Sequence, residues 1–248
     1  MHTPKPTQHD ATRTTAAVAA LMDQLRTVRS LAGAPTGLAA ATKRLVIKTL
    51  VESATRQEPD ARRHARTVRR YSACIARQLG LDGESIGVIK NAAMVHDVGK
   101  IGIDGRILNK PGRLTADEVT VVRRHPRIGA DMLACCGLFE GEAPLVLHHH
   151  ERFDGQGYPD RLCGEHVPLG ARVLGVADAL DAMLTPRSYK PAFTIARARH
   201  ELMVESHRQF DPAVVDAALL WLADTPLDAT TVPASPDART RTCAPSDR

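Results

Sequence analysis

Eleven histidines are distributed along this chain of 248 residues, and several lie beside carboxylates in patterns that suit metal ions. His96 and Asp97 end the most apolar stretch of the sequence, where a buried carboxylate is costly unless it is paired or binds a cation. An aspartate can bridge two divalent ions, one through each oxygen. His64 lies four residues after Asp60, so both side chains point the same way if this segment is a helix. These spacings predict a metal site.

Further candidate ligands follow along the chain. His125 precedes a proline, residues 148–151 read His-His-His-Glu, and Asp178 and Asp181 are three residues apart. Taken singly, each has a simpler explanation as a core histidine, a helix cap or surface charge. Together they favour a site of imidazole and carboxylate ligands, which suits Mn or Fe better than a thiolate zinc site. Two such ions about 3.5–4 Å apart are the usual apparatus of phosphoryl hydrolysis.

Helices are expected to position these residues. Aromatic residues make up only 3% of the chain, Ala, Leu, Val and Arg are abundant, and the 43% of hydrophobic residues suffices for a core. The fold class is therefore predicted to be all-α. Apolar periodicity and cap residues predict helices at about 16–31, 38–56, 60–79, 84–97, 115–124, 126–135, 140–150, 169–184, 194–207 and 212–223. Glycine-rich loops are expected between 99 and 112 and between 154 and 168.

The domain organisation follows from these segments. Residues 1–37 are predicted to form a tail with a short accessory helix, residues 38–223 a catalytic domain, and residues 224–248, rich in Pro, Thr, Ser and Asp, a disordered tail. No stretch of about 18 apolar residues predicts a membrane span, and no apolar leader opens the chain. The five cysteines form no Cys-x-x-Cys pair. These features predict a cytoplasmic protein that does not insert into membranes.

The net charge of +5 is concentrated in one stretch. Seven arginines lie between residues 56 and 77, accompanied only by Glu58 and Asp60. Such an excess suits an anionic partner such as a nucleotide, although a solvated helix face is the simpler explanation. Because no aromatic residues are interleaved with the arginines and no zinc-finger or RRM signature is present, nucleic-acid binding is not expected.

At this point two motifs resemble a known family. Residues 96–100, His-Asp-Val-Gly-Lys, resemble the H-D-x-G-K signature of HD-superfamily phosphohydrolases, and residues 149–159, HHERFDGQGYP, resemble H-H-E-R-x-D-G-x-G-Y-P of the HD-GYP subfamily. The resemblance extends over about residues 38–223. It implies an HD-superfamily helical bundle with a GYP loop formed by Gly157, Tyr158 and Pro159. It also implies a hydrolase that converts the bacterial second messenger cyclic di-GMP to pGpG, and in some members onward to GMP.

The resemblance also implies the site residues, carried over by position. One ion would be held by His64, His96, Asp97 and Asp178, and a second by Asp97, His125, His149 and His150. Asp97 and Lys100 would be catalytic, with Lys100 facing a metal-bridging hydroxide or a phosphate oxygen. Asp60 stands where some members hold a third ion with a glutamate, so a third ion is left open. His148 falls outside the motif and is interpreted as structural.

Substrate contacts are implied at Arg187 and Lys190, which would grip a phosphate or a guanine edge, with Tyr189 supporting their loop. The leading hypothesis is thus a phosphodiesterase for cyclic di-GMP with two divalent ions, Fe or Mn, that acts in signal transduction. One alternative keeps the metal chemistry but takes another cyclic dinucleotide, such as cyclic GMP-AMP. The other is a non-catalytic sensor or a module that docks GGDEF-domain cyclases through the GYP loop. The sequence does not indicate the oligomeric state, although the helix at 16–31 is expected to serve docking or dimerisation.

Overall fold

The fold is given by a computed structural model, which describes residues 8–29, 36–186 and 191–224. The predicted all-α class is confirmed, and the described residues contain no strand. The helices are α1 (Gln8–Val28), α2 (Thr36–Gln57), α3 (Ala61–Gln78), α4 (Gly83–Val95), α5 (Gly105–Leu108), α6 (Ala116–Val122), α7 (His125–Cys136), α8 (Glu142–His148), α9 (Leu169–Leu184), α10 (Ile195–Val204) and α11 (Pro212–Asp224), with 3-10 turns η2 (Val98–Gly102) and η3 (Gly164–His166).

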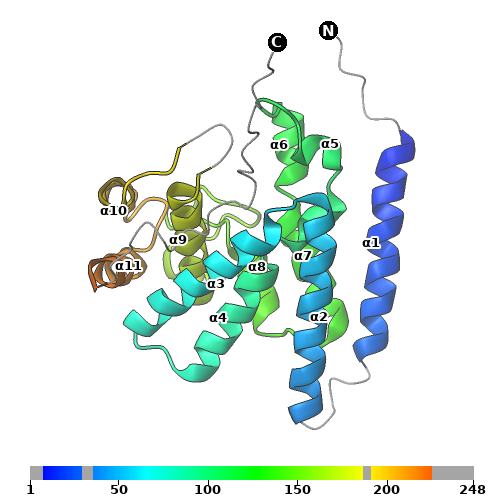
Figure 1. The fold of residues 1–248 in the computed structure, drawn as a ribbon, viewed down its shortest axis with the longest axis horizontal. Helices are drawn as coiled ribbons and strands as arrows, with labels where there is room; N and C mark the ends of the chain where they lie inside the picture. Colours follow the sequence, from blue (N-terminus) through cyan, green and yellow to red (C-terminus); the bar gives the residue numbers. More distant parts are fainter. Residues whose placement is uncertain (1–7, 30–35, 187–190, 225–248) are drawn as a thin grey trace, which may run out of the picture.

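Helix α3 lies at the centre of the bundle and packs against α2, α4, α9 and α11. Figure 1 shows α3 and α4 side by side, with α10 and α11 at one end of the molecule and α1 and α2 at the other. The apolar face of α3 follows helical spacing, and both Val68 and Ile75 are fully buried. Opposite them, α9 buries Leu174 and Leu180 in the same core. This packing holds α3 and α9, which both carry candidate ligands, at a fixed separation.

Several helix ends follow from local sequence. Thr115 and Glu118 form the expected capping box at the start of α6, with each side chain bonded to the other residue's backbone N–H. Asp211 accepts a hydrogen bond from the Ala213 N–H at the start of α11, as its place before Pro212 predicted. These local signals are strong enough to set boundaries without help from tertiary packing.

The structure differs from the sequence prediction in two places. Helix α1 is not short: it spans 21 residues and begins at Gln8. The prediction placed its start too late, because the polar residues that open the helix show no apolar periodicity. The expected loop over 99–112 contains the turn η2 and the four-residue helix α5. Helix α1 packs against η2 and α7. The predicted disordered tail lies, from residue 225 onward, outside the described residues.

Gly99 marks the closest approach between two backbone segments. A Cβ atom on Gly99 would lie 1.9 Å from the His125 carbonyl oxygen and 2.5 Å from the Gly129 nitrogen. Only glycine therefore fits where η2 touches α7. As a result, the loop that follows His96 and the first turn of α7 are in direct backbone contact.

None of the described helices is both long and apolar enough to cross a lipid bilayer.

Candidate metal centre

Helix ends and helix faces bring the candidate ligands together. His96 and Asp97 follow the last turn of α4, His125 opens α7, and His149 and His150 follow α8. His64 comes instead from the first turn of α3 and Asp178 from the middle of α9, and these two helices pack against each other. The seven side chains form two clusters, in each of which the potential ligand atoms lie within 4.8 Å of one another.

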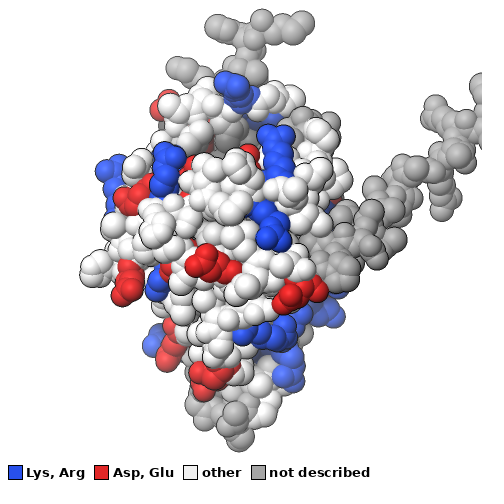
Figure 2. Space-filling view, turned by 90° about the vertical axis from the view of Figure 1, so that its left-hand side faces the viewer, with Lys and Arg blue, Asp and Glu red and all other residues white. Residues whose placement is uncertain are grey.

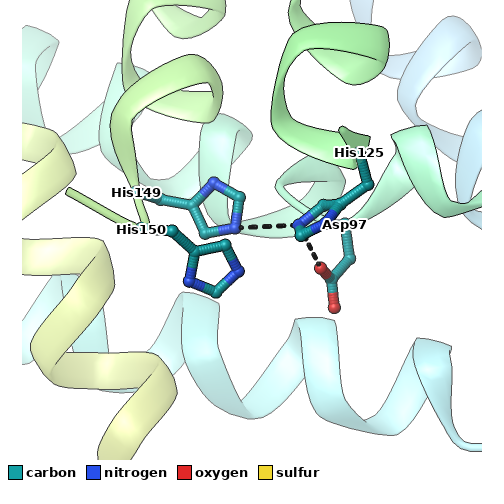
Figure 3. A group of neighbouring side chains, drawn as sticks. All are labelled: Asp97, His125, His149 and His150. Atoms are coloured by element: carbon teal, nitrogen blue, oxygen red, sulfur yellow. Dashed lines mark hydrogen bonds and ion pairs between the residues drawn. The ribbon is translucent and has the colours of Figure 1, made fainter. Parts of the chain in front are cut away.

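The first group, called here the triple-histidine cluster, consists of Asp97, His125, His149 and His150. Figure 3 shows the three imidazoles and the carboxylate turned toward one another. His125 Nε2 lies 3.3 Å from Asp97 Oδ1 and 3.4 Å from His149 Nε2. The rings of His149 and His150 are 4.0 Å apart. His125 and His149 are almost completely buried, so this cluster lies deep in the bundle.

The second group, called the two-histidine cluster, consists of His64, His96 and Asp178. His64 Nε2 lies 3.2 Å from His96 Nε2 and 3.4 Å from Asp178 Oδ1. The side chain of Asp178 is 26% exposed, compared with 2% for that of His125 in the first cluster. The two-histidine cluster therefore faces solvent more openly.

Asp97 lies between the two clusters. Its Oδ1 points to His125, while its Oδ2 lies 3.5 Å from His96 Nε2 and 3.7 Å from His64 Nε2. Lys100 Nζ also donates to Oδ2, at 2.8 Å. Burial alone would raise the pKa of Asp97, but the positive charge of Lys100 and the neighbouring His96 and His125 hold it well below its usual range. The carboxylate is thus ionised, with one oxygen directed to each cluster.

Three imidazoles are oriented by the backbone. The Nδ1 atoms of His96, His125 and His149 lie 2.9, 2.8 and 2.7 Å from the carbonyl oxygens of the residues three positions earlier. Because a carbonyl only accepts, each Nδ1 must carry the proton, which leaves each Nε2 free to bind a cation. Burial lowers the pKa of His96 and His149 below the ordinary value, so these rings are neutral ligands at neutral pH.

His64 is oriented by a side chain instead. Its Nδ1 lies 2.7 Å from Asp181 Oδ2, and Thr185 donates to the other oxygen of Asp181 at 3.0 Å. Burial alone would lower the pKa of His64, but the hydrogen bond with Asp181 and the charge of Asp178 raise it above its ordinary value. Such a carboxylate–imidazole pair is a common support for a metal-binding histidine.

His150 is positioned by its packing on the GYP loop. Its ring is stacked on Tyr158 with centroids 4.9 Å apart and an interplanar angle of 28°, and Arg123 lies over the same tyrosine ring at 5.1 Å. Burial lowers the pKa of His150 to about 4. Gly157 is buried in this loop, where a Cβ would lie 2.3 Å from the Arg152 nitrogen. The loop thus packs directly against the metal centre.

The structure brings the seven predicted core ligands together in the two expected groups, and Asp60 belongs to neither group. The Asp60 side chain is 85% exposed and contacts Arg63 at 3.4 Å; it lines the cavity beside the clusters but adds no ligand atom to either. Arg187, Tyr189 and Lys190 lie outside the described residues. His148 bonds the Pro144 carbonyl and Asp160, which fits its structural interpretation.

Two residues near the centre have contacts that the sequence did not reveal: Asp181, a candidate ligand by its spacing, and Glu58, which had no expected role. Asp181 shares a face of α9 with Asp178, and that spacing was the available signal for its contact with His64. Glu58 lies 3.7 Å from Lys100 Nζ, a contact across the fold that local spacing does not reveal. Burial alone would lower the pKa of Lys100, but Asp97 and Glu58 raise it above its ordinary value, so the ammonium stays charged.

The residues present fit a pair of divalent ions. Imidazole nitrogens and the carboxylate of Asp178 gather around Asp97, and no cysteine belongs to either cluster of the described residues. This donor set suits ions of the Mn or Fe class. A cavity of about 670 Å³ opens beside the clusters and is lined by residues that include Glu58, Arg63, Lys100 and Asn109. A cavity of this size can hold a nucleotide-sized ligand.

Comparison with known proteins agrees with this geometry. The HD domain family matches residues 48–214. The cyclic di-GMP phosphodiesterase response regulator RpfG of Xanthomonas campestris pv. campestris is 48% identical over 147 residues, which cover 58% of this chain and 39% of that protein. The 3'3'-cGAMP-specific phosphodiesterase 2 of Vibrio cholerae serotype O1 is 34% identical over 180 residues, which cover 72% of this chain and 34% of that protein. The chain thus spans between a third and two fifths of the length of these two relatives.

A solved structure shows the same fold. Bd1817, an HDG"Y"P protein from Bdellovibrio bacteriovorus, matches 85% of this chain and 72% of its own, with a TM-score of 0.56 and 17% sequence identity. At that identity the likeness concerns the fold alone.

Proposed function

The chain belongs to the HD domain family, and from this membership we propose that it is a metal-dependent phosphodiesterase that hydrolyses cyclic di-GMP to linear pGpG and onward to GMP. The observation that carries the proposal is the placement of Asp97, which directs one oxygen to each of two ligand clusters. A two-ion centre of this type is the common apparatus for hydrolysing phosphate esters. Several relatives are named cyclic di-GMP phosphodiesterases.

Each cluster would hold one ion, and Asp97 would bind both ions. One ion would be held by His64, His96 and Asp178, and the other by His125, His149 and His150. When bound, such ions lower the pKa of water and neutralise charge on phosphate oxygens. Net hydrolysis forms a bond from water oxygen to phosphorus, breaks the bond from phosphorus to the ribose 3′ oxygen, and leaves a proton on that oxygen.

Lys100 would stabilise the negative charge that develops on phosphate. Its ammonium is fixed by Asp97 at 2.8 Å and also lines the cavity beside the clusters. A preorganised cation in a partly buried site is worth more to a transition state than the same charge in water. Arg187, Tyr189 and Lys190 remain the proposed contacts to the rest of the substrate, and a third ion near Asp60 remains a secondary proposal.

A second candidate substrate is another cyclic dinucleotide. The relatives include proteins named 3'3'-cGAMP-specific phosphodiesterases, one of them 34% identical over 180 residues. The metal centre acts on the phosphodiester bond, which is the same in both molecules, so it does not distinguish the bases. A purely sensory role is less favoured, because the seven predicted ligands are all present and converge.

Other parts of the proposal rest on the sequence alone. They are Fe or Mn as the ion, a catalytic domain over 38–223, docking of GGDEF-domain cyclases through the GYP loop, and a cytoplasmic location in bacterial signalling.

Product analysis tests the proposed function. The protein, loaded with Mn²⁺ or with Fe²⁺ under anaerobic conditions, would be incubated with cyclic di-GMP and with 3'3'-cGAMP, and the products separated by chromatography. We expect pGpG and GMP from cyclic di-GMP, and no product from the Asp97→Ala variant. If two ions are bound but neither dinucleotide is cleaved, the proposal is wrong. Cleavage of 3'3'-cGAMP alone would establish the second candidate instead.

A further inference from the structure

The arginine-rich stretch of the sequence forms a groove beside the metal centre. Four of its arginines lie on one side of α3 and, together with three residues around them, enclose a hollow of about 500 Å³. The lining residues are Thr55, Pro59, Arg62, Arg63, Arg66, Thr67 and Arg70. The groove is therefore concave and contains no carboxylate or aromatic side chain in its lining.

The positive charge in the groove is poorly compensated. Arg62 contacts Glu52 at 3.3 Å and Arg63 contacts Asp60 at 3.4 Å, but both carboxylates are well exposed to water. Exposed pairs of this kind contribute only about 0–1 kcal/mol. No described carboxylate forms an ion pair with Arg66. Glu58, the remaining acidic residue of this stretch, faces Lys100 instead. Arg70 lies over the ring of Tyr71.

A solvated helix face explains this arrangement less well than a binding site. Figure 2 shows acidic and basic side chains interspersed over the face that it draws, whereas the residues that line the groove include four arginines and no acid. An ordinary solvated face carries both signs and is convex. Here like charges converge on a hollow, which raises the local concentration of anions.

We propose that this groove is a binding site for the polyphosphate chain of a nucleoside triphosphate, separate from the metal centre. Guanidinium groups match the oxygens of phosphate in pairs, and several of them suit a chain with several charges. The volume is sufficient for a nucleotide. Because no aromatic ring lines the groove, the site recognises phosphates and not the base.

A chain of hydrogen bonds connects the groove to the metal centre. Arg63 lines both the groove and the cavity beside the clusters. Its Nη1 donates to Thr185 Oγ1 at 3.4 Å, and Thr185 donates in turn to Asp181, which orients His64. An anion in the groove would therefore compete with Thr185 for the donors of Arg63.

Binding of a fluorescent ATP analogue, measured by anisotropy with excess Mg²⁺ and metal-loaded protein, tests the proposal. We expect saturable binding that GTP and Mg²⁺-saturated tripolyphosphate displace at concentrations similar to ATP. The variant R66Q/R70Q should bind at least tenfold more weakly. The matched control R69Q/R77Q removes two charges from the same helix outside the groove and should change affinity less than twofold. Circular dichroism would verify that both variants are folded.

Four outcomes would overturn the proposal. Three are no saturable binding, an equal loss in the groove and control variants, and a twelve-nucleotide single strand that displaces the probe at lower concentration than ATP does. The Asp97→Asn variant should retain binding, and a loss there would place the anion in the metal centre. Because the readout is binding, it is independent of whether the proposed hydrolysis occurs.

Discussion

The two ligand clusters meet at Asp97 but are built differently. In the triple-histidine cluster, His125 and His149 are oriented by backbone carbonyls of their own helical turns. In the two-histidine cluster, His64 is oriented by the side chain of Asp181. His96 of the two-histidine cluster is also held by a backbone carbonyl, so His64 is the ligand whose Nδ1 depends on a replaceable side chain. Substitution around His64 should therefore disturb its cluster more than substitution around His125 and His149 disturbs theirs.

Removing the shared ligand should produce the largest effect. In Asp97→Ala we expect both ions to be lost and hydrolysis to fall by about 10³-fold or more, because each ion contributes several kcal/mol to the transition state. His149→Ala and His64→Ala should each reduce the bound metal from two ions to about one. Metal analysis by mass spectrometry of dialysed protein provides the measurement. An Asp97→Ala protein that retains one full ion would show that the clusters are independent.

Substitution of Asp181 should affect only the two-histidine cluster. In Asp181→Ala, His64 loses the acceptor that fixes its proton on Nδ1, and we expect affinity for one ion to fall about 10–100-fold. Asp181→Asn should cost less, since an amide oxygen can still accept that bond. Titration of metal into the metal-free protein measures the two affinities separately. Equal weakening of both ions would contradict the division between the clusters.

In the metal-free protein, His150 and His64 should contribute to the pH dependence of stability with opposite sign. His150 has a pKa of about 4 when folded, so the unfolded chain, whose histidines titrate near 6.5, binds more protons as pH falls. As the pH falls from 7.5 to 5, this difference in proton binding lowers the free energy of unfolding by about 2 kcal/mol. The pKa of His64 is raised, so its contribution is present at low pH and is lost as pH rises through the folded value.

Urea unfolding in the presence of EDTA, repeated across this pH range, measures these contributions. The variant His150→Gln should show a flatter decline of stability toward low pH than the unsubstituted protein, and His64→Gln a steeper one. If both variants change the slope of stability against pH in the same direction, the contrast between His150 and His64 is wrong.

The smallest effect is expected at the GYP loop. Tyr158→Leu removes the ring stacked on His150, and we expect it to cost about 0.5–1.5 kcal/mol of stability. Tyr158→Phe keeps the ring and serves as the matched control, with a change near zero. Thermal unfolding of the metal-free proteins compares the two. A larger loss in Tyr158→Phe than in Tyr158→Leu would show that the hydroxyl matters more than the ring.

Much of the fold and of the ligand set could be predicted from sequence, because their signals are local. The helix caps at Thr115 and Asp211 depend on only a few neighbouring residues, and the His-Asp and His-His pairs are adjacent in the sequence. The spacing of Asp178 and Asp181 marks a shared face of α9, but the contact of Asp181 with His64 depends on how α3 and α9 pack. The contact of Glu58 with Lys100 depends on how α2 and η2 pack, which local spacing does not reveal. The polar start of α1 was missed for lack of apolar periodicity.

The contact at Gly99 has a consequence for anyone who would redesign this centre. The turn η2, which follows Asp97, and the start of α7, which carries His125, are held together at Gly99, where an added Cβ would collide with the His125 carbonyl oxygen. A larger residue at position 99 would therefore force these two segments apart. An engineer seeking a different metal would exchange ligands and keep this glycine.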